Sequence, residues 1–154
     1  MTDWLSFWSK ERRKLNKALE PFTHIYIPYG DERILPGDTI YCVGIEDGDL
    51  YLFTRVEIRR RSKDLDPTHI KSVLAHPKTK IVTDYNRPLP RPVVESLRYL
   101  RVNSSIRYKV EWRDKYKVEP QQFRGPSSLR ELVQGAPNLD SLFASKSPPS
   151  PKRK

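Results

Sequence analysis

The chain has 154 residues and a mass of 18.1 kDa, which is enough for one compact domain with extensions. Its 29 lysines and arginines exceed its 19 acids, and the formal net charge of +10 favours polyanionic partners without indicating a fold. Its apolar runs fall far short of the roughly 18 residues that a membrane span needs. Because Cys42 is the only cysteine, an intrachain disulfide and a multi-cysteine zinc site are excluded.

The N-terminal segment predicts a helix that precedes the main domain. Asp3 suits the N-cap position, and Pro21 would end a helix over residues 3–19. Apolar side chains at helical spacing fall near one face, namely Trp4, Trp8, Leu15 and Leu19. Apolar residues here come before charged ones, the reverse of a signal peptide, so we expect an intracellular protein, cytoplasmic or nucleoid-associated, that has no membrane partner. Residues 1–22 form the predicted N-terminal helix.

Two β-rich runs form the clearest predicted element. Thr39–Ile45 and Leu50–Ile58 flank Asp47-Gly48, the kind of dipeptide that a tight hairpin turn prefers. Alternation in the second run places four apolar side chains on one core-facing side, namely Leu50, Leu52, Val56 and Ile58. Before the hairpin we expect an edge strand over residues 23–29 and a turn over residues 35–38.

The rest of the chain predicts short elements of both kinds. They are a helix over 66–76, a strand over 80–83, a proline-rich loop over 84–92, a helix over 92–100, a strand over 105–112, and one or two helical turns within 128–143. This order predicts an α+β domain over residues 23–144, built on a small, curled or closed, mostly antiparallel β-barrel with short flanking helices. The basic, proline-rich residues 145–154 predict a disordered tail.

The residues give little support to catalysis. The histidines lie in separate segments apart from His69 and His76, and no nucleophile elbow, Walker loop or dinucleotide-binding loop occurs. We therefore expect no catalytic residue, no metal site and no cofactor. One alternative stays open, a nucleic-acid-processing enzyme that would use carboxylates and a lysine from Asp84, Glu111 and Lys115.

Two separate stretches hold most of the excess positive charge. Residues 55–80 contain eight lysines and arginines against three acids, and residues 98–117 contain seven against two. On one face of the fold they would form an electrostatic footprint for a phosphate backbone, whereas apart they are two ordinary solvated strand faces. The expected phosphate contacts are Arg59, Arg60, Arg61, Lys63 and Arg124.

Aromatic residues alternate with these cations, as they do in proteins that stack unpaired bases. Tyr29 precedes Gly30 at a strand end and Tyr85 lies in the proline-rich loop, so we expect both rings to line a base pocket. The other candidates for this pocket are Trp8, Tyr26 and Trp112, and for each ring core packing is the alternative. A protein-binding adaptor is the second alternative class, and it would use an exposed apolar patch of Trp4, Leu5, Phe7 and Trp8.

Two tracts resemble the PUA-like superfamily, which includes the EVE, ASCH and YTH domains. Leu35–Gly44 with Asp47–Val56 is similar to its Pro-Gly-Asp turn, strand, turn and strand, and residues 108–112 with residues 118–124 are similar to its late strand and final segment. The resemblance covers residues 23–143. It implies a β-barrel that recognises DNA or RNA, often a modified base in an aromatic pocket, in some relatives beside a nuclease or motor partner. Only residues 30–36 separate the first predicted strand from the Gly-Asp turn here, without the tryptophan-bearing insert that commonly supplies one wall of the base pocket in this superfamily. Trp4 or Trp8 would have to supply that wall instead.

Overall fold

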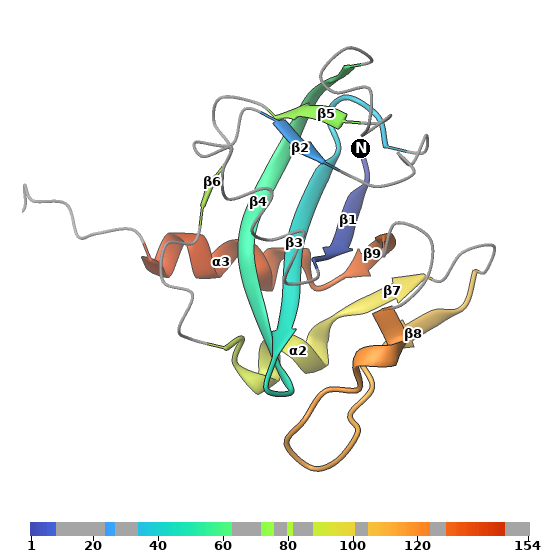
Figure 1. Cartoon of the computed structure of the whole chain (residues 1–154), viewed down its shortest axis with the longest axis vertical. Helices are drawn as coiled ribbons and strands as arrows, with labels where there is room; N and C mark the ends of the chain where they lie inside the picture. The colour runs from blue at the N-terminus through green and yellow to red at the C-terminus, as the bar shows by residue number, and fades with distance from the viewer. Residues whose placement is uncertain are drawn as a thin grey trace, which may run out of the picture.

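The chain folds around one open, mixed β-sheet (Figure 1). The computed structural model describes residues 1–8, 24–26, 34–62, 72–75, 80–81, 88–100, 105–123 and 129–146. The strands follow the order β2-β5-β4-β3-β1-β9-β7-β8 across the sheet, and β6 pairs with β4. Their bounds are β1 Asp3–Phe7, β2 His24–Tyr26, β3 Thr39–Glu46, β4 Asp49–Ser62, β5 Ser72–Ala75, β6 Lys80–Ile81, β7 Arg98–Leu100, β8 Arg107–Lys109 and β9 Leu129–Gln134.

The sheet is open rather than closed. A barrel needs its end strands to pair, but β2 and β8 stand at opposite ends of the strand order and do not pair with each other in the part of the chain that the structure describes. The predicted curled or closed barrel is therefore wrong. The described pairs are antiparallel except for β1 with β3, which run parallel from Asp3 opposite Thr39 to Phe7 opposite Val43.

The predicted helix from Asp3 is also wrong over Asp3–Phe7, which form β1, and the remainder of that predicted helix lies outside the described residues. β1 pairs with β3 on one side and with β9 on the other, so it is a central strand. Its aromatic residues fit a strand that is buried on both faces, with Trp4 on one face and Leu5 on the other. Pairing with distant strands therefore overrides the helical spacing that the isolated segment shows.

The predicted hairpin is confirmed. β3 and β4 are antiparallel neighbours joined by Asp47 and Gly48, whose φ angles are 52° and 83°. Two successive positive φ angles are what a two-residue hairpin turn with the right-handed strand twist requires, and the Asp-Gly dipeptide tolerates them.

A β-bulge in β4 overturns the predicted common face of its four apolar residues. Cys42 pairs with Thr54 but Val43 pairs with Leu52, so Phe53 is the extra residue. Because the side-chain period of a strand is two, one extra residue exchanges the faces beyond it. The apolar residues before the bulge accordingly belong to one core cluster and those after it to the other.

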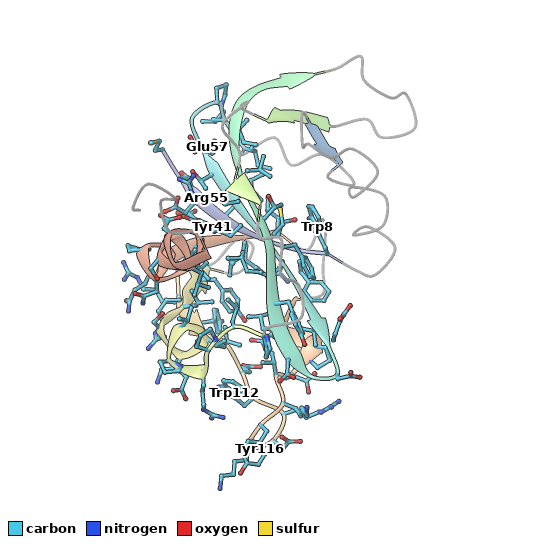
Figure 2. The ribbon with its side chains drawn as sticks, turned by 90° about the vertical axis from the view of Figure 1, so that its left-hand side faces the viewer. Trp8, Tyr41, Arg55, Glu57, Trp112 and Tyr116 are labelled. Atoms are coloured by element: carbon cyan, nitrogen blue, oxygen red, sulfur yellow. The ribbon has the colours of Figure 1, made fainter. Side chains whose placement is uncertain are left out.

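Each face of the sheet carries its own hydrophobic core. Figure 2 shows Tyr41 and Trp8 on opposite sides of the sheet, with α2 (Arg91–Ser96) and α3 (Ala136–Lys146) on the side of Tyr41. The first cluster includes Leu5, Tyr41, Leu97 and Leu139, all at most 1% exposed. The second is formed by Trp4, Trp8, Ile34, Ile40, Cys42, Phe53, Val56, Ile58 and Leu129.

The later elements differ from the predictions in type as well as in length. The expected helix over 66–76 is wrong over Ser72–Ala75, which form β5, and the rest of that predicted helix lies outside the described residues. The expected helix over 92–100 ends at Ser96, and after the C-cap residue Leu97 the residues Arg98–Leu100 pair as β7. The expected helical turns within 128–143 are the strand β9 followed by α3. The expected strand over 105–112 is shorter, as β8, and a 3-10 helix, η1 (Pro120–Phe123), follows it. Among the described residues, no helix combines the length and apolar character that crossing a membrane requires.

Candidate functional site

An exposed basic segment runs from the edge of the sheet into the loop that follows. β8 is the end strand of the sheet order, and Arg107 and Lys109 are exposed on it, while Tyr108 between them packs against the core. Arg113 and Lys115 are exposed in the loop beyond. We call Arg107, Lys109, Arg113 and Lys115 the cationic strip. No ion pair between described residues engages any of its four side chains.

The nearest acid in the loop is already used by the backbone. Asp114 Oδ1 accepts hydrogen bonds from the N–H groups of Tyr116, at 2.8 Å, and Lys117, at 2.9 Å. These two bonds hold the pKa of Asp114 below its usual value, so this carboxylate stays charged while it shapes the turn. It therefore acts as the structural anchor of the loop more than as a counterion for the strip.

The loop over residues 112–118 is fastened at its base and to the hairpin turn. Trp112 and Val118 form an antiparallel bridge, and the Arg113 N–H donates to the Lys117 carbonyl at 2.7 Å. The Val118 N–H donates to the Gly48 carbonyl at 2.8 Å, which ties the loop to the β3–β4 turn. The loop is therefore a defined structure on which the basic side chains stand.

Gln122 is buried beside the loop, and its side-chain amide makes four hydrogen bonds to three residues. Its Oε1 accepts from the Glu111 N–H at 2.6 Å and from the Tyr99 hydroxyl at 3.2 Å. Its Nε2 donates to the carbonyls of Glu111, at 2.8 Å, and Glu119, at 2.7 Å. Because one amide side chain satisfies both backbone groups of Glu111, it fixes the chain between β8 and the loop.

Tyr116 stands at the tip of this loop. Its side chain is 65% exposed, and Figure 2 shows it projecting from the end of the molecule. The Lys115 amino group lies 5.5 Å from the centre of its ring. Sequence reasoning missed this residue, although a tyrosine between two lysines and two residues after a turn-forming aspartate is a readable signal.

An acidic turn limits the basic surface on one side. Glu46, Asp47 and Asp49 surround Gly48, and a Cβ placed on Gly48 would lie 2.4 Å from the Lys117 side chain, so Lys117 is packed against this turn. Burial, followed by the three nearby carboxylates, raises the pKa of Tyr51 in the same hairpin. We therefore leave Lys117 out of the cationic strip.

A second polar cluster fastens α3 to the sheet. The Tyr41 hydroxyl donates to Asp140 Oδ1 at 2.7 Å, and Arg55 forms ion pairs with Asp140, at 2.9 Å, and Glu57, at 2.6 Å (Figure 2). Burial, then the hydrogen bond to Asp140, raises the pKa of Tyr41, so its hydroxyl stays protonated. Arg55 thus belongs to the packing of the fold, although the sequence counts it in the first basic stretch.

The structure describes few of the predicted contact residues. Tyr29, Tyr85, Lys63 and Arg124 lie outside the described residues. The arginines Arg59, Arg60 and Arg61 belong to β4 and Tyr26 belongs to β2, but their side chains also lie outside the described part.

The two described ring candidates are both engaged within the fold. Trp8 is 3% exposed and stacks on Phe53 with ring centres 6.2 Å apart, so its ring forms part of the core. Trp112 is partly buried, and the guanidinium of Arg91 covers its ring.

The two basic stretches do not share one sheet edge. Arg59, Arg60 and Arg61 lie in the part of β4 that pairs with β5, and Arg107 and Lys109 lie in β8. Strands β3, β1, β9 and β7 separate β4 from β8. Figure 1 shows that end of β4 beside β5, away from β8. A single groove between these strands is therefore not formed by the described residues, and the cationic strip has to be considered by itself.

The alternative functions find little in the described residues. No group of three or more metal-ligating side chains gathers there, and Asp84 of the hypothetical carboxylate pair lies outside them. The prediction that an adaptor would expose an apolar patch here is wrong, because Trp4, Leu5 and Trp8 are at most 3% exposed. Comparisons of the chain with protein-family models, with curated proteins and with solved structures find no match.

Proposed function

We propose that this protein binds nucleic acid through the cationic strip on β8 and the loop over residues 112–118. The observation that carries the proposal is the exposure of four cations within the nine residues 107–115, none of them in an ion pair with a described side chain. Exposed lysines and arginines that lack acidic partners attract phosphates and release the counterions condensed on them. An exposed aromatic ring, Tyr116, lies among these charges.

The proposal predicts that affinity falls steeply with salt, with a slope set by the number of phosphates that the protein neutralises. If each of the four strip cations neutralises one phosphate, the slope of log K against log salt concentration is about −3 for a single strand. Affinity then falls about 50-fold between about 50 and 200 mM salt. Fluorescence anisotropy with labelled single-stranded RNA and DNA of mixed sequence measures this slope directly.

Three charge-matched variants locate the interface. The triple variant Arg107→Gln, Lys109→Gln, Lys115→Gln should weaken binding and reduce the slope by about 2. Its control is Lys152→Gln, Arg153→Gln, Lys154→Gln, which removes the same three charges from the C-terminal end and should keep the slope. The third variant is Arg59→Gln, Arg60→Gln, Arg61→Gln, which tests the other basic stretch. The proposal is overturned if no probe binds at low salt, or if only the second or third variant reduces the slope.

Reading of a modified base, beside a nuclease or motor partner, is a separate proposal that is supported by the resemblance to the PUA-like superfamily. Its residues are Tyr29 and Tyr85. It predicts that a probe with one methylated base binds more tightly than its unmodified twin, and that Tyr29→Ala and Tyr85→Ala abolish the difference while the salt slope stays. Equal affinity of the protein for both probes, across methylated adenine and methylated cytosine, would contradict it. An intracellular location is also proposed, on the order of apolar and charged residues in the N-terminal segment.

A further inference from the structure

We infer that the ligand of the cationic strip is a single strand, and that one of its unpaired bases stacks on the ring of Tyr116. This inference rests on the proposed function and adds the class of nucleic acid and a contact residue. Tyr116 is the most exposed aromatic side chain among the described residues, at 65%, although large aromatic rings are normally turned into a core.

The backbone that carries the ring is held in place by hydrogen bonds. Asp114 accepts the Tyr116 N–H, the Lys117 carbonyl accepts the Arg113 N–H, and Arg91 donates through Nη1 to the Lys115 carbonyl. Three separate contacts therefore fix the residues on both sides of the ring. A ring on a preformed loop loses little conformational freedom when a ligand covers it, and this keeps the entropic cost of binding low.

The charges around the ring suit an extended strand. Arg107 and Lys109 are two residues apart on one strand, so their side chains leave the same face about 6.8 Å apart. Lys115 follows in the loop with its amino group 5.5 Å from the Tyr116 ring. A sugar–phosphate backbone that contacts these cations from β8 into the loop would bring its bases to the Tyr116 ring. Other proteins bind single strands in this way, with cations on the phosphates and aromatic rings stacked on the bases.

A duplex fits this arrangement less well. The flat faces of paired bases are covered by their neighbours in the stack, so one ring on a loop tip cannot reach them without unstacking a base. The grooves of duplex DNA are instead read by an inserted helix or a two-stranded ribbon, whereas the described residues here offer a strand of three residues at a sheet edge. The arrangement of ring and cations therefore favours the single strand.

The test compares four proteins on matched probes. Tyr116→Ala should weaken binding to single-stranded RNA or DNA by roughly 5-fold to 100-fold, the range that stacking of one base supplies. Tyr116→Phe should bind within about 2-fold of the unaltered protein, because the stack does not need the hydroxyl. Leu35→Ala is the matched control, since it shortens another exposed side chain, at 59%, in the 35–38 turn. It should bind as the unaltered protein does.

Two further probes separate stacking from charge. On a strand whose bases are replaced by abasic sites, Tyr116→Ala and the unaltered protein should bind equally, and on a duplex the substitution should have no effect. The inference is overturned if Tyr116→Ala binds single strands as tightly as the unaltered protein. In that case the proposed function still stands if the variant Arg107→Gln, Lys109→Gln, Lys115→Gln has a reduced salt slope. An unaltered protein that prefers duplex at every salt concentration also overturns the inference. Circular dichroism confirms that the variants fold.

Discussion

The guanidinium carbon of Arg91 lies 4.0 Å from the centre of the Trp112 ring. The same side chain donates through Nη1 to the Lys115 carbonyl and pairs with Glu95, four residues later in α2, at 3.2 Å. Arg91 thus connects the start of α2 with both the base and the far side of the loop that carries Tyr116. The loop that we assign to ligand binding is therefore positioned by a residue that itself lies outside the cationic strip.

Replacing Arg91 should loosen this loop. Arg91→Ala removes the contact with the Trp112 ring and the hydrogen bond to Lys115, so we expect a loss of about 1 kcal/mol in the free energy of unfolding. Arg91→Lys keeps the charge near the ring but not the planar guanidinium. Its free energy of unfolding should lie between those of the original protein and Arg91→Ala. Urea titration measures the loss, and hydrogen exchange of the loop amides shows where it occurs. Unchanged exchange at residues 113–117 would contradict the positioning role.

Gln122 should contribute more to stability than Arg91, because its side chain makes four hydrogen bonds from a buried position. Gln122→Ala leaves both backbone groups of Glu111 and the Tyr99 hydroxyl without this amide, so we expect a loss of about 2–3 kcal/mol in unfolding free energy. Gln122→Glu keeps an acceptor but turns a carboxylate oxygen toward two carbonyls. Its loss at neutral pH should equal or exceed that of the alanine variant, and should shrink in acid as the carboxyl group is protonated. A loss below about 0.5 kcal/mol would show that water replaces the amide.

Asp38 fastens the N-terminus to the turn before β3. Its carboxylate, 3% exposed, accepts the N–H groups of Thr2, at 2.9 Å, and Leu35, at 2.9 Å, and the Trp4 indole N–H at 3.0 Å. Asp38→Ala removes the acceptor that these three donors share, so we expect a loss of about 3–4 kcal/mol in unfolding free energy. Asp38→Asn keeps one acceptor oxygen and should cost less. Thermal unfolding measures both losses, and equal stability of the alanine variant and the original protein would exclude this role.

Gly44 makes room for an aromatic pair. A Cβ at this position would lie 2.5 Å from Cε2 of Phe53 and 3.1 Å from the Trp8 carbonyl oxygen. Because Phe53 is 2% exposed and stacked on Trp8, its ring has little space to move, and Gly44→Ala should destabilise the protein by about 2–3 kcal/mol. The double variant Gly44→Ala with Phe53→Leu should lose less than the sum of the two single losses, because the smaller side chain relieves the clash. If the loss in the double variant equals the sum of the two single losses, the contact between Gly44 and Phe53 is contradicted.

Asp3 should make stability fall as the pH rises. Burial, followed by the charge of Asp140, raises its pKa above the ordinary value of 3.8, so the folded state holds this proton more tightly than the unfolded state does. Stability is then lost as the pH rises from about 3.8 through the raised folded value. Asp3→Asn should be more stable than the original protein at pH 7, by less than about 1 kcal/mol because the group is partly solvated. The difference should vanish near pH 3, and a difference that is independent of pH would contradict this account.

The candidate site was partly visible in the sequence. The basic stretch over residues 98–117 is evident from its charge, and the structure shows that Arg107, Lys109, Arg113 and Lys115 are exposed. The sequence offers Trp112 as a ring for base stacking, but whether Arg91 covers that ring depends on how α2 lies against the loop. Tyr116 has a readable sequence signal, but its exposure is known only from the structure, in which the other described aromatic side chains are buried or partly buried.

By itself, the sequence determined the features that depend on neighbouring residues. Asp47-Gly48 specifies the hairpin turn, and the β-rich runs on each side of it become β3 and β4. Only the tertiary structure decided that residues 3–7 form a central strand, that an extra residue at Phe53 exchanges the faces of β4, and that the two basic stretches lie on strands far apart in an open sheet. The first and the last of these depend on pairing between segments tens of residues apart, because burial and backbone hydrogen bonds with distant partners outweigh the local preferences of a short segment. The bulge depends on the register in which β3 and β4 pair.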